Sequence, residues 1–141
     1  MQHLEAGLRI NKENLDEEVA NLPSVFYTVS DHYLEALKHS KRLQERLDRT
    51  FARLASAMRS AAQAEGGARA ITETQLKQEV LIHPKYRKLK AKLVSAQYVQ
   101  DRWSALKDGY IQKSFSLKGL VSLAVSEQYQ SPHSTRTGRK R

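Results

Sequence analysis

Apolar residues recur along this chain at the three- and four-residue spacings of an amphipathic helix. The first long run extends from Phe26 to Ala61, and a helix of about 40 residues would be about 60 Å long at 1.5 Å per residue. In a second run, apolar residues recur at intervals of seven, which is typical of a coiled coil. That run contains Leu89, Ala96, Trp103, Tyr110 and Leu117, with Leu93, Val99 and Leu106 on the same side. The pattern predicts an all-α chain.

Proline and glycine residues indicate where the first elements begin and end. Pro23 has no backbone N–H and disfavours helix in the residue before it, so we expect the first long helix to begin there. The pair Gly66–Gly67 is predicted to end that helix. A short helix is expected next over residues 71–82, with Thr72 or Thr74 as its N-cap.

The second long helix is predicted to follow Pro84, with Gly109 and Gly119 marking a kink or break because each costs about 1 kcal/mol relative to Ala. Residues 130–141 offer no apolar core and are expected to form a disordered basic tail. Residues 1–129 would then form a single helical domain. Two long helices joined by a glycine turn predict a long antiparallel helical hairpin with a short connecting helix.

The end of the second helix carries apolar residues that have no evident mate in so short a chain. We expect a second copy to cover them, so this segment is predicted to be a C-terminal oligomerisation helix. The predicted interface contains Phe115, Leu117, Leu120, Val121, Leu123 and Ala124, and Val125 continues the stretch.

Composition restricts the protein class further. The chain has 141 residues and no cysteine, so disulfides and thiolate chemistry are excluded. The first residues lack the pattern of a signal peptide, and no run approaches the roughly 18 apolar residues of a membrane span. These features predict a soluble, cytoplasmic protein without membrane contact.

The charge is concentrated in the second half of the chain. Of a formal net charge of +9, residues 84–113 supply eight cations against two anions. The stretch HPKYRKLKAK at residues 83–92 has no acid to neutralise its cations, and such crowding favours a polyanionic partner. Tyr86 within it could stack on a base or pack in the core.

Two sets of cations are candidate DNA-binding residues. On the first helix an arc of about 140° holds Lys38, Lys41, Arg42, Arg46, Arg49, Arg53 and Arg59. On the second helix the set is Lys85, Arg87, Lys88, Lys90 and Lys92. Ordinary solvated surface remains an alternative, because Glu45 and Asp48 could form ion pairs on the first helix. Without a base-reading motif, binding is expected to be directed at the backbone and indifferent to sequence.

No catalytic chemistry is indicated. His32, Glu35 and His39 could share part of a helix face, but a metal site would need further ligands. Phosphate-binding loops, nucleophile elbows and zinc-protease motifs are missing from the sequence. We therefore expect no enzyme, no metal site and no cofactor.

The order of short motifs resembles the UvsY-type recombination mediator proteins of tailed phages. The front, INKENLDEEVANLP followed by DHYLEAL, is similar to the family pattern at Ile10, Leu15, Glu18, Pro23, Tyr33 and Leu34. After a long basic helix and a glycine turn, ITETQLKQEVLIHPKY resembles the family's short capped helix and restart. The stretch SFSLKGLVSL resembles its terminal helix at Phe115, Leu117, Lys118, Leu120 and Leu123. Together these motifs cover residues 10–125.

This resemblance implies a mediator that binds single-stranded DNA and loads a RecA-like recombinase onto strands coated by single-strand DNA-binding protein. It also implies a ring-like homo-oligomer, a hexamer or heptamer, assembled through the C-terminal helix in the cytoplasm of a phage-infected bacterium. Arg53 and Arg59 match the family's DNA-binding positions on the long first helix.

Two other functions remain open from the sequence. One is a helical scaffold or packaging component of a phage, in which the positive charge serves solubility or assembly. The other is an architectural protein for duplex DNA or RNA. Both would be non-enzymatic.

Overall fold

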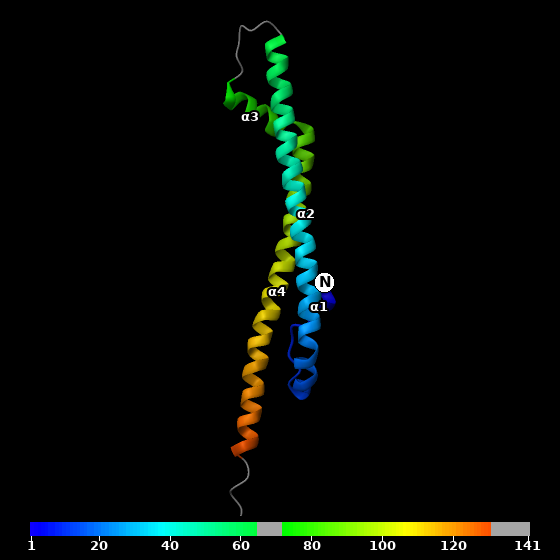
Figure 1. Ribbon diagram of the computed structural model, residues 1–141, viewed down its shortest axis with the longest axis vertical. Helices are drawn as coiled ribbons and strands as arrows, with labels where there is room; N and C mark the ends of the chain where they lie inside the picture. The colour runs from blue at the N-terminus through cyan, green and yellow to red at the C-terminus, as the bar shows by residue number, and fades with distance from the viewer. Residues whose placement is uncertain (65–71, 131–141) are drawn as a thin grey trace, which may run out of the picture. The chain divides into compact units, whose positions relative to one another are not determined.

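The computed structural model describes residues 1–64 and 72–130, and all its elements are helical, which confirms the all-α prediction (Figure 1). In chain order they are α1 (Gln2–Ala6), the 3-10 helix η1 (Lys12–Asn14), α2 (Leu15–Ala64), α3 (Glu73–Ile82) and α4 (Pro84–Gln130). The predicted turn at Gly66–Gly67 lies outside the described residues. Of the predicted basic tail over residues 130–141, only Gln130 is described, and it is the last residue of α4. Within those described ranges, no helix has both the length and the apolar character needed to cross a membrane.

The chain divides into two compact units, whose boundaries fall within α2 and α4. Unit 1 contains residues 1–30 together with the chain from residue 105 onward, and unit 2 contains residues 31–104. Each unit is described separately below.

Helix α2 begins at Leu15, so the prediction that it begins at Pro23 is wrong. Acidic residues fill the first turn, where they interact favourably with the partial positive charge of the helix N-terminus. Glu18 in that turn also accepts a hydrogen bond from the Asn11 backbone N–H at 3.0 Å. Pro23 therefore lies inside the helix, where the missing N–H costs one hydrogen bond without ending the element.

The start of α3 confirms Thr72, one of the two predicted caps, whereas Thr74 lies inside the helix. The Thr72 hydroxyl accepts from the Gln75 backbone N–H at 3.3 Å, and the Gln75 side chain accepts in return from the Thr72 N–H at 3.2 Å. This reciprocal capping box satisfies two backbone donors that the helix itself leaves unpaired.

Helix α4 begins with Pro84 at its first position, where a missing N–H has no cost. It continues through Gly109 and Gly119, so neither glycine breaks it. At Gly109 the absence of a side chain has a packing role, because an added Cβ would lie 3.1 Å from Leu8 Cδ2. At Gly119 an added Cβ would meet nothing within 4 Å.

In unit 2, α2 and α4 pack against each other in opposite directions. His32 stacks on Trp103 with ring centroids 4.6 Å apart, and the Ser40 hydroxyl lies 2.5 Å from the Gln100 side-chain oxygen. The ring of Phe51 meets Tyr86 edge-on at 6.1 Å. As the residue number on α2 rises, the partner's number on α4 falls. Between these contacts the buried residues are Leu43, Leu47, Leu93 and Ala96.

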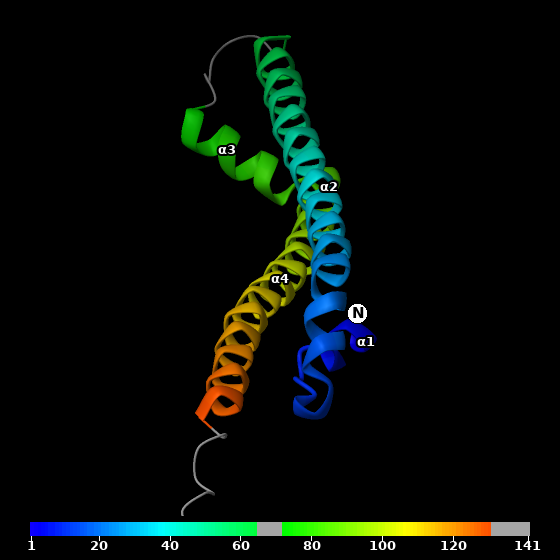
Figure 2. The same ribbon diagram turned by 60° about the horizontal axis from the view of Figure 1, so that its bottom comes forward.

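Helix α3 adds a second cluster to unit 2. Its buried Leu76 and Val80 pack with Ala55 of α2, and Tyr86 joins this cluster as well as the one between α2 and α4. In both ribbon views α3 lies alongside the later part of α2 (Figures 1 and 2). The short helix thus covers the apolar face of α2 beyond Leu47.

Unit 1 is organised around a buried lysine. The side chain of Lys113 on α4 is only 6% exposed, and its ammonium donates three hydrogen bonds. The acceptors are the carbonyls of Gly7 at 2.7 Å and Arg9 at 3.2 Å, and the Glu18 carboxylate at 2.5 Å. Because an ammonium has three donors, Lys113 is fully satisfied. Its bonds hold the N-terminal segment and the start of α2 on α4.

Tyr110, one turn before Lys113, reinforces this arrangement. Its hydroxyl donates to the Leu4 carbonyl at 2.8 Å, and the residue is only 2% exposed. Burial, together with the negative charge of Glu18, raises the pKa of Tyr110 above its usual value. The hydrogen bond from Lys113, assisted by that from Asn11, lowers the pKa of Glu18 despite the opposing effect of burial.

Replacing Gly7 by Ala should destabilise unit 1, because the added Cβ would lie 2.5 Å from the Tyr110 hydroxyl. The buried tyrosine cannot move away freely, so we expect a loss of about 1–3 kcal/mol in the free energy of unfolding, measured by urea denaturation. Gly119→Ala is the matched control and should gain about 0.4–1 kcal/mol, because its Cβ meets open space within a helix. Equal effects of the two substitutions would contradict this packing.

The pH dependence of Glu18→Gln should report the lysine contact. A carboxylate with a lowered folded pKa stabilises the protein above its unfolded pKa, near 4.5, and loses that contribution as the pH falls through the folded value. Wild type should therefore be more stable than E18Q at neutral pH, with a difference that shrinks in acid, in urea titrations across this range. Glu45→Gln, at an exposed carboxylate, serves as the control. A difference that does not change with pH would exclude this role for the charge.

Candidate nucleic-acid interface

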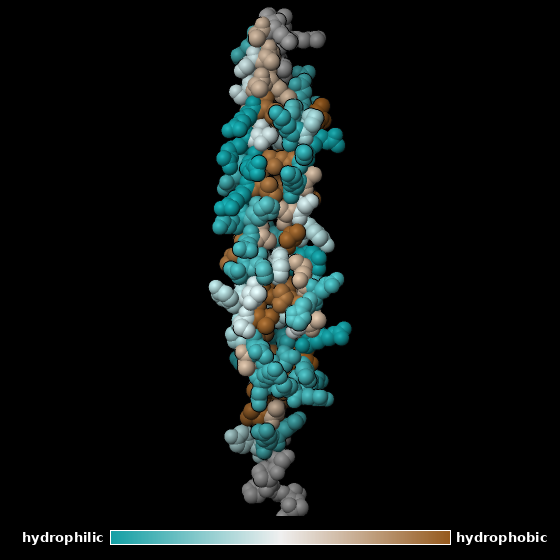
Figure 3. Space-filling model, turned by 90° about the vertical axis from the view of Figure 1, so that its right-hand side faces the viewer, coloured by the Kyte–Doolittle hydropathy of each residue, from teal (hydrophilic) through white to brown (hydrophobic). Residues whose placement is uncertain are grey.

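All twelve predicted DNA-binding cations are exposed. On the face of the molecule shown in Figure 3, apolar side chains form narrow patches bordered by hydrophilic ones. This arrangement is expected of long helices, in which a narrow stripe packs and the charged side chains flank it. Exposure alone does not distinguish a binding surface from a solvated one, so the arrangement of the cations decides what they can bind.

Helix geometry divides the basic stretch of α4 between two faces. Lys88 and Lys92 are four residues apart and share a face, whereas Lys90, two residues from each, points away from them. Lys85 shares the face of Lys88 and Lys92, and Arg87 lies nearer to that of Lys90. The five cations therefore do not form one continuous patch.

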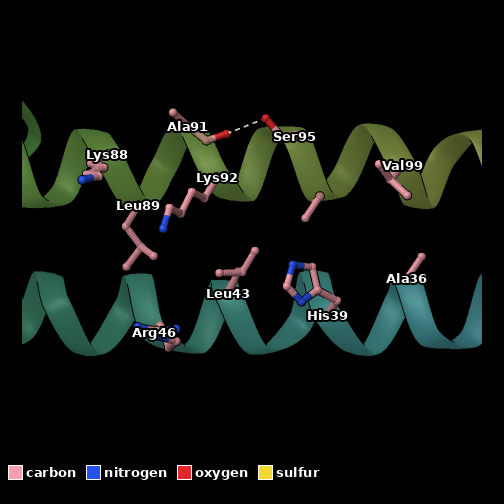
Figure 4. Close-up of a pocket in the computed structure, with 11 residues that line it drawn as sticks. Ala36, His39, Leu43, Arg46, Lys88, Leu89, Ala91, Lys92, Ser95 and Val99 are labelled. Carbon is pink, nitrogen blue, oxygen red and sulfur yellow. Dashed lines mark hydrogen bonds between the residues drawn. The ribbon is translucent and has the colours of Figure 1, made fainter.

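The face of Lys88 and Lys92 borders a groove between α2 and α4 in unit 2 (Figure 4). The groove has a volume of about 780 Å³, and Arg46 and His39 approach it from α2. Its remaining lining is formed by Ala36, Leu43, Leu89, Ala91, Ser95, Ala96 and Val99. Lys92 projects toward α2 in the close-up, and Arg46 lies on the facing helix. Cations from both helices thus border the groove together with apolar side chains.

Val99 shows why this groove is open. The heptad pattern predicts Val99 in the packed stripe, but it is 44% exposed and lines the groove. Ala36, on α2, lies at the same end of the groove in the close-up (Figure 4). Its single methyl group leaves Val99 without a large partner.

Two of the predicted DNA-binding cations form ion pairs within the protein. Arg59 contacts the Glu73 carboxylate of α3 at 2.5 Å, and Arg49 lies 3.8 Å from Glu45 on its own helix. Both pairs are largely exposed, so each contributes little to stability. In the part of the chain that the structure describes, no carboxylate pairs in this way with Arg46, Lys88 or Lys92. These three cations are therefore better placed for an external anion.

The remaining members of the two sets lie outside the groove lining. They are Lys38, Lys41, Arg42 and Arg53 on α2, and Lys85, Arg87 and Lys90 on α4. Each of these seven cations lies on an exposed helix surface outside the groove.

The aromatic residue of the basic stretch is packed. Tyr86 is half-buried, meets the Phe51 ring and contributes to both hydrophobic clusters of unit 2. His32 likewise lies on Trp103, away from the lining of the groove, whereas His39 borders it. No group of three or more His, Asp or Glu residues in the described ranges could hold a metal ion.

The predicted oligomerisation set is divided by burial within unit 1. Leu117 is only 1% exposed, so the prediction that this stretch lacks cover within the chain is wrong for that residue. Phe115 is 64% exposed and Leu123 is 60% exposed. Leu120, Val121 and Ala124 are half-buried.

Lys113 was not among the predicted site residues, although a sequence signal for it exists. It occupies a position between Tyr110 and Leu117 at the spacing of the apolar stripe, where a cation is unexpected. The position of Lys113 in the stripe indicates that its side chain faces inward. Its three oxygen acceptors could not be predicted, because they come from residues far away in the sequence.

Comparison with known proteins finds no matching family model, no matching curated protein and no matching solved structure.

Proposed function

We propose that this protein is a non-enzymatic recombination mediator that binds single-stranded DNA as an oligomer. In this proposal it promotes the loading of a RecA-like recombinase onto strands coated by single-strand DNA-binding protein. The observation that carries the proposal is the groove of unit 2, where Arg46, Lys88 and Lys92 surround an apolar floor. The order of motifs that resembles UvsY-type phage mediators also supports it. The proposed place of action is the cytoplasm of a phage-infected bacterium.

The cations of the groove suit the phosphates of a flexible strand. Arg46 can donate two parallel hydrogen bonds to one phosphate, while Lys88 and Lys92 act as mobile point charges on the facing helix. Such contacts read the backbone rather than the base edges, so binding should be largely indifferent to sequence. The cations on other surfaces of α2 and α4 would add long-range attraction.

The proposed architecture is a long antiparallel helical hairpin, with α3 as its connecting helix. The opposite directions of α2 and α4 within unit 2 support it. Copies would assemble into a ring, a hexamer or heptamer, through the end of α4. The exposed Phe115 and Leu123 support this interface, with Leu120, Val121 and Ala124 between and beside them. Leu117 would support the interface from inside its own subunit.

Assembly would strengthen DNA binding without new contacts. One groove with three cations would bind a strand weakly. In an oligomer, a strand bound to one groove is held close to the grooves of the other subunits, and this high effective concentration can increase the overall affinity 100-fold or more. A strand held by several subunits would be drawn away from its coating protein and presented to the recombinase.

A titration of a fluorescent oligonucleotide at several salt concentrations tests the proposal. Wild type should bind single strands near physiological salt, and the triple variant Arg46→Ala, Lys88→Ala, Lys92→Ala should flatten the log–log salt slope by about 2, at about 0.7 per phosphate contact. The double variant Arg49→Ala, Arg59→Ala removes two cations that already contact carboxylates and should change the slope less.

Three results would contradict this proposal. Absence of strand binding near physiological salt would favour a scaffold or packaging component. A preference for duplex would favour an architectural protein. An unchanged slope in the triple variant, with an unchanged helical circular-dichroism spectrum, would remove the groove from the site.

The proposed interface can be tested without disturbing the core of unit 1. Leu120→Asp combined with Leu123→Asp places charges on the outer part of α4, so we expect smaller species by light scattering and weaker DNA binding. Tyr27→Asp, at a residue 74% exposed on α2, is a control for a new surface charge. If the particle mass of the double variant equals that of wild type, the end of α4 is not the interface.

A further inference from the structure

The floor of the groove is more apolar than phosphate binding requires. Phosphates need donors and positive charge, which Arg46, Lys88 and Lys92 supply at the rim. Beneath them Leu89 is half-buried and Val99 is 44% exposed, while the buried Leu43 and Ala96 close the bottom of the groove. Apolar surface left in water favours an occupant that also has apolar surface to bury.

A small side chain keeps this floor accessible. Ala36 of α2 lies opposite Val99 of α4 in the close-up, so no large side chain covers that end of the groove (Figure 4). Ala91 and Ser95 lie on the side of α4 turned away from α2, and the Ser95 hydroxyl donates to the Ala91 carbonyl at 3.1 Å. A larger residue at position 36 would fill the groove without changing any charge.

The matching ligand combines a flat apolar part with a regular series of anions. An unpaired nucleotide has this character, because its base offers two ring faces and its phosphate stays in water. In a duplex the bases are stacked on one another, so only phosphates and base edges remain accessible. The rim can contact either form of DNA, but the floor can contact only an unpaired strand.

We propose that the floor of the groove holds unpaired bases while Arg46, Lys88 and Lys92 hold the adjoining phosphates. This inference rests on the proposed function and specifies its ligand. Preference for single strands over duplex then comes from the apolar floor, and overall affinity comes from the cations.

The size of the groove limits how many bases it holds. Its lining extends from Lys88 to Val99 on α4, a length of about 16 Å at the helical rise of 1.5 Å per residue. At the duplex spacing of about 3.4 Å per nucleotide this length spans about five nucleotides, and fewer when the strand is stretched. Each groove therefore contacts only a short piece of strand.

Filling the groove tests the inference. The variant Ala36→Leu adds bulk to the groove from α2 and leaves every cation in place. Ala62→Leu is the matched control, since it makes the same change at another half-buried alanine of α2 that lies outside the groove lining. Three fluorescent probes of equal length are used: oligothymidine, an abasic phosphodiester strand and a duplex.

Wild type should bind oligothymidine about tenfold more tightly than the abasic strand, because burying roughly 55 Å² of apolar surface at about 25 cal/mol per Å² corresponds to about 1.4 kcal/mol, which is tenfold. The filled variant should lose this preference while its abasic and duplex affinities and its salt slope stay unchanged. Val99→Thr, which keeps the shape of the side chain but replaces one methyl group by a hydroxyl, should lower the preference partly. It provides a second measurement if the filled variant unfolds.

Two results would overturn the inference. Equal affinity of wild type for base-bearing and abasic strands would show that bases do not enter the groove. Retention of the preference by the filled variant would place the base contacts elsewhere and leave the groove for a protein partner. Neither result is confused with failure of the proposed function, in which wild type binds none of the three probes or prefers the duplex.

Discussion

A helix as long as α2 or α4 carries only a narrow apolar stripe, and such a helix is marginally stable in water until another element covers that stripe. This constraint determines what packs in each unit. In unit 2 the stripe of α2 meets α4 around Leu43 and α3 around Ala55. In unit 1 the N-terminal segment covers α4 around Tyr110. Each stretch of long helix thus depends on a different partner.

The same constraint explains the candidate site. Packing uses the large apolar residues of the stripe, so lysine and arginine are left along its borders. Where the α2 residue opposite Val99 is as small as Ala36, the two helices cannot close the space between them, and a groove bordered by cations results. The groove therefore lies where small side chains leave a gap between well-packed contacts of α2 and α4. For this reason cations and apolar side chains line it together.

Much of the fold could be predicted from the sequence, because periodicity and capping are local signals. The all-α class, the Thr72 cap and the helix that follows His83 depend on neighbouring residues. The start of α2 could not be predicted in the same way. Pro23 is a strong local signal for a beginning, but acidic residues of the preceding turns and the contact of Glu18 with Lys113 extend the helix past it.

The candidate site was predictable in its residue types but not in its grouping. Sequence identifies the cations on each helix, and geometry along α4 separates Lys90 from Lys88. Whether Arg46 faces Lys92 depends on the register of two helices whose residues lie far apart in the sequence. The ion pair of Arg59 with Glu73 and the burial of Leu117 have the same non-local origin.

The buried Lys113 has a practical consequence for handling the protein. Its carbonyl acceptors, at Gly7 and Arg9, are supplied by the first residues of the chain. Deleting that segment for crystallisation would remove two of the three acceptors of Lys113 and uncover the surface of α4 around Tyr110. Purification tags are therefore better attached at the other end of the polypeptide.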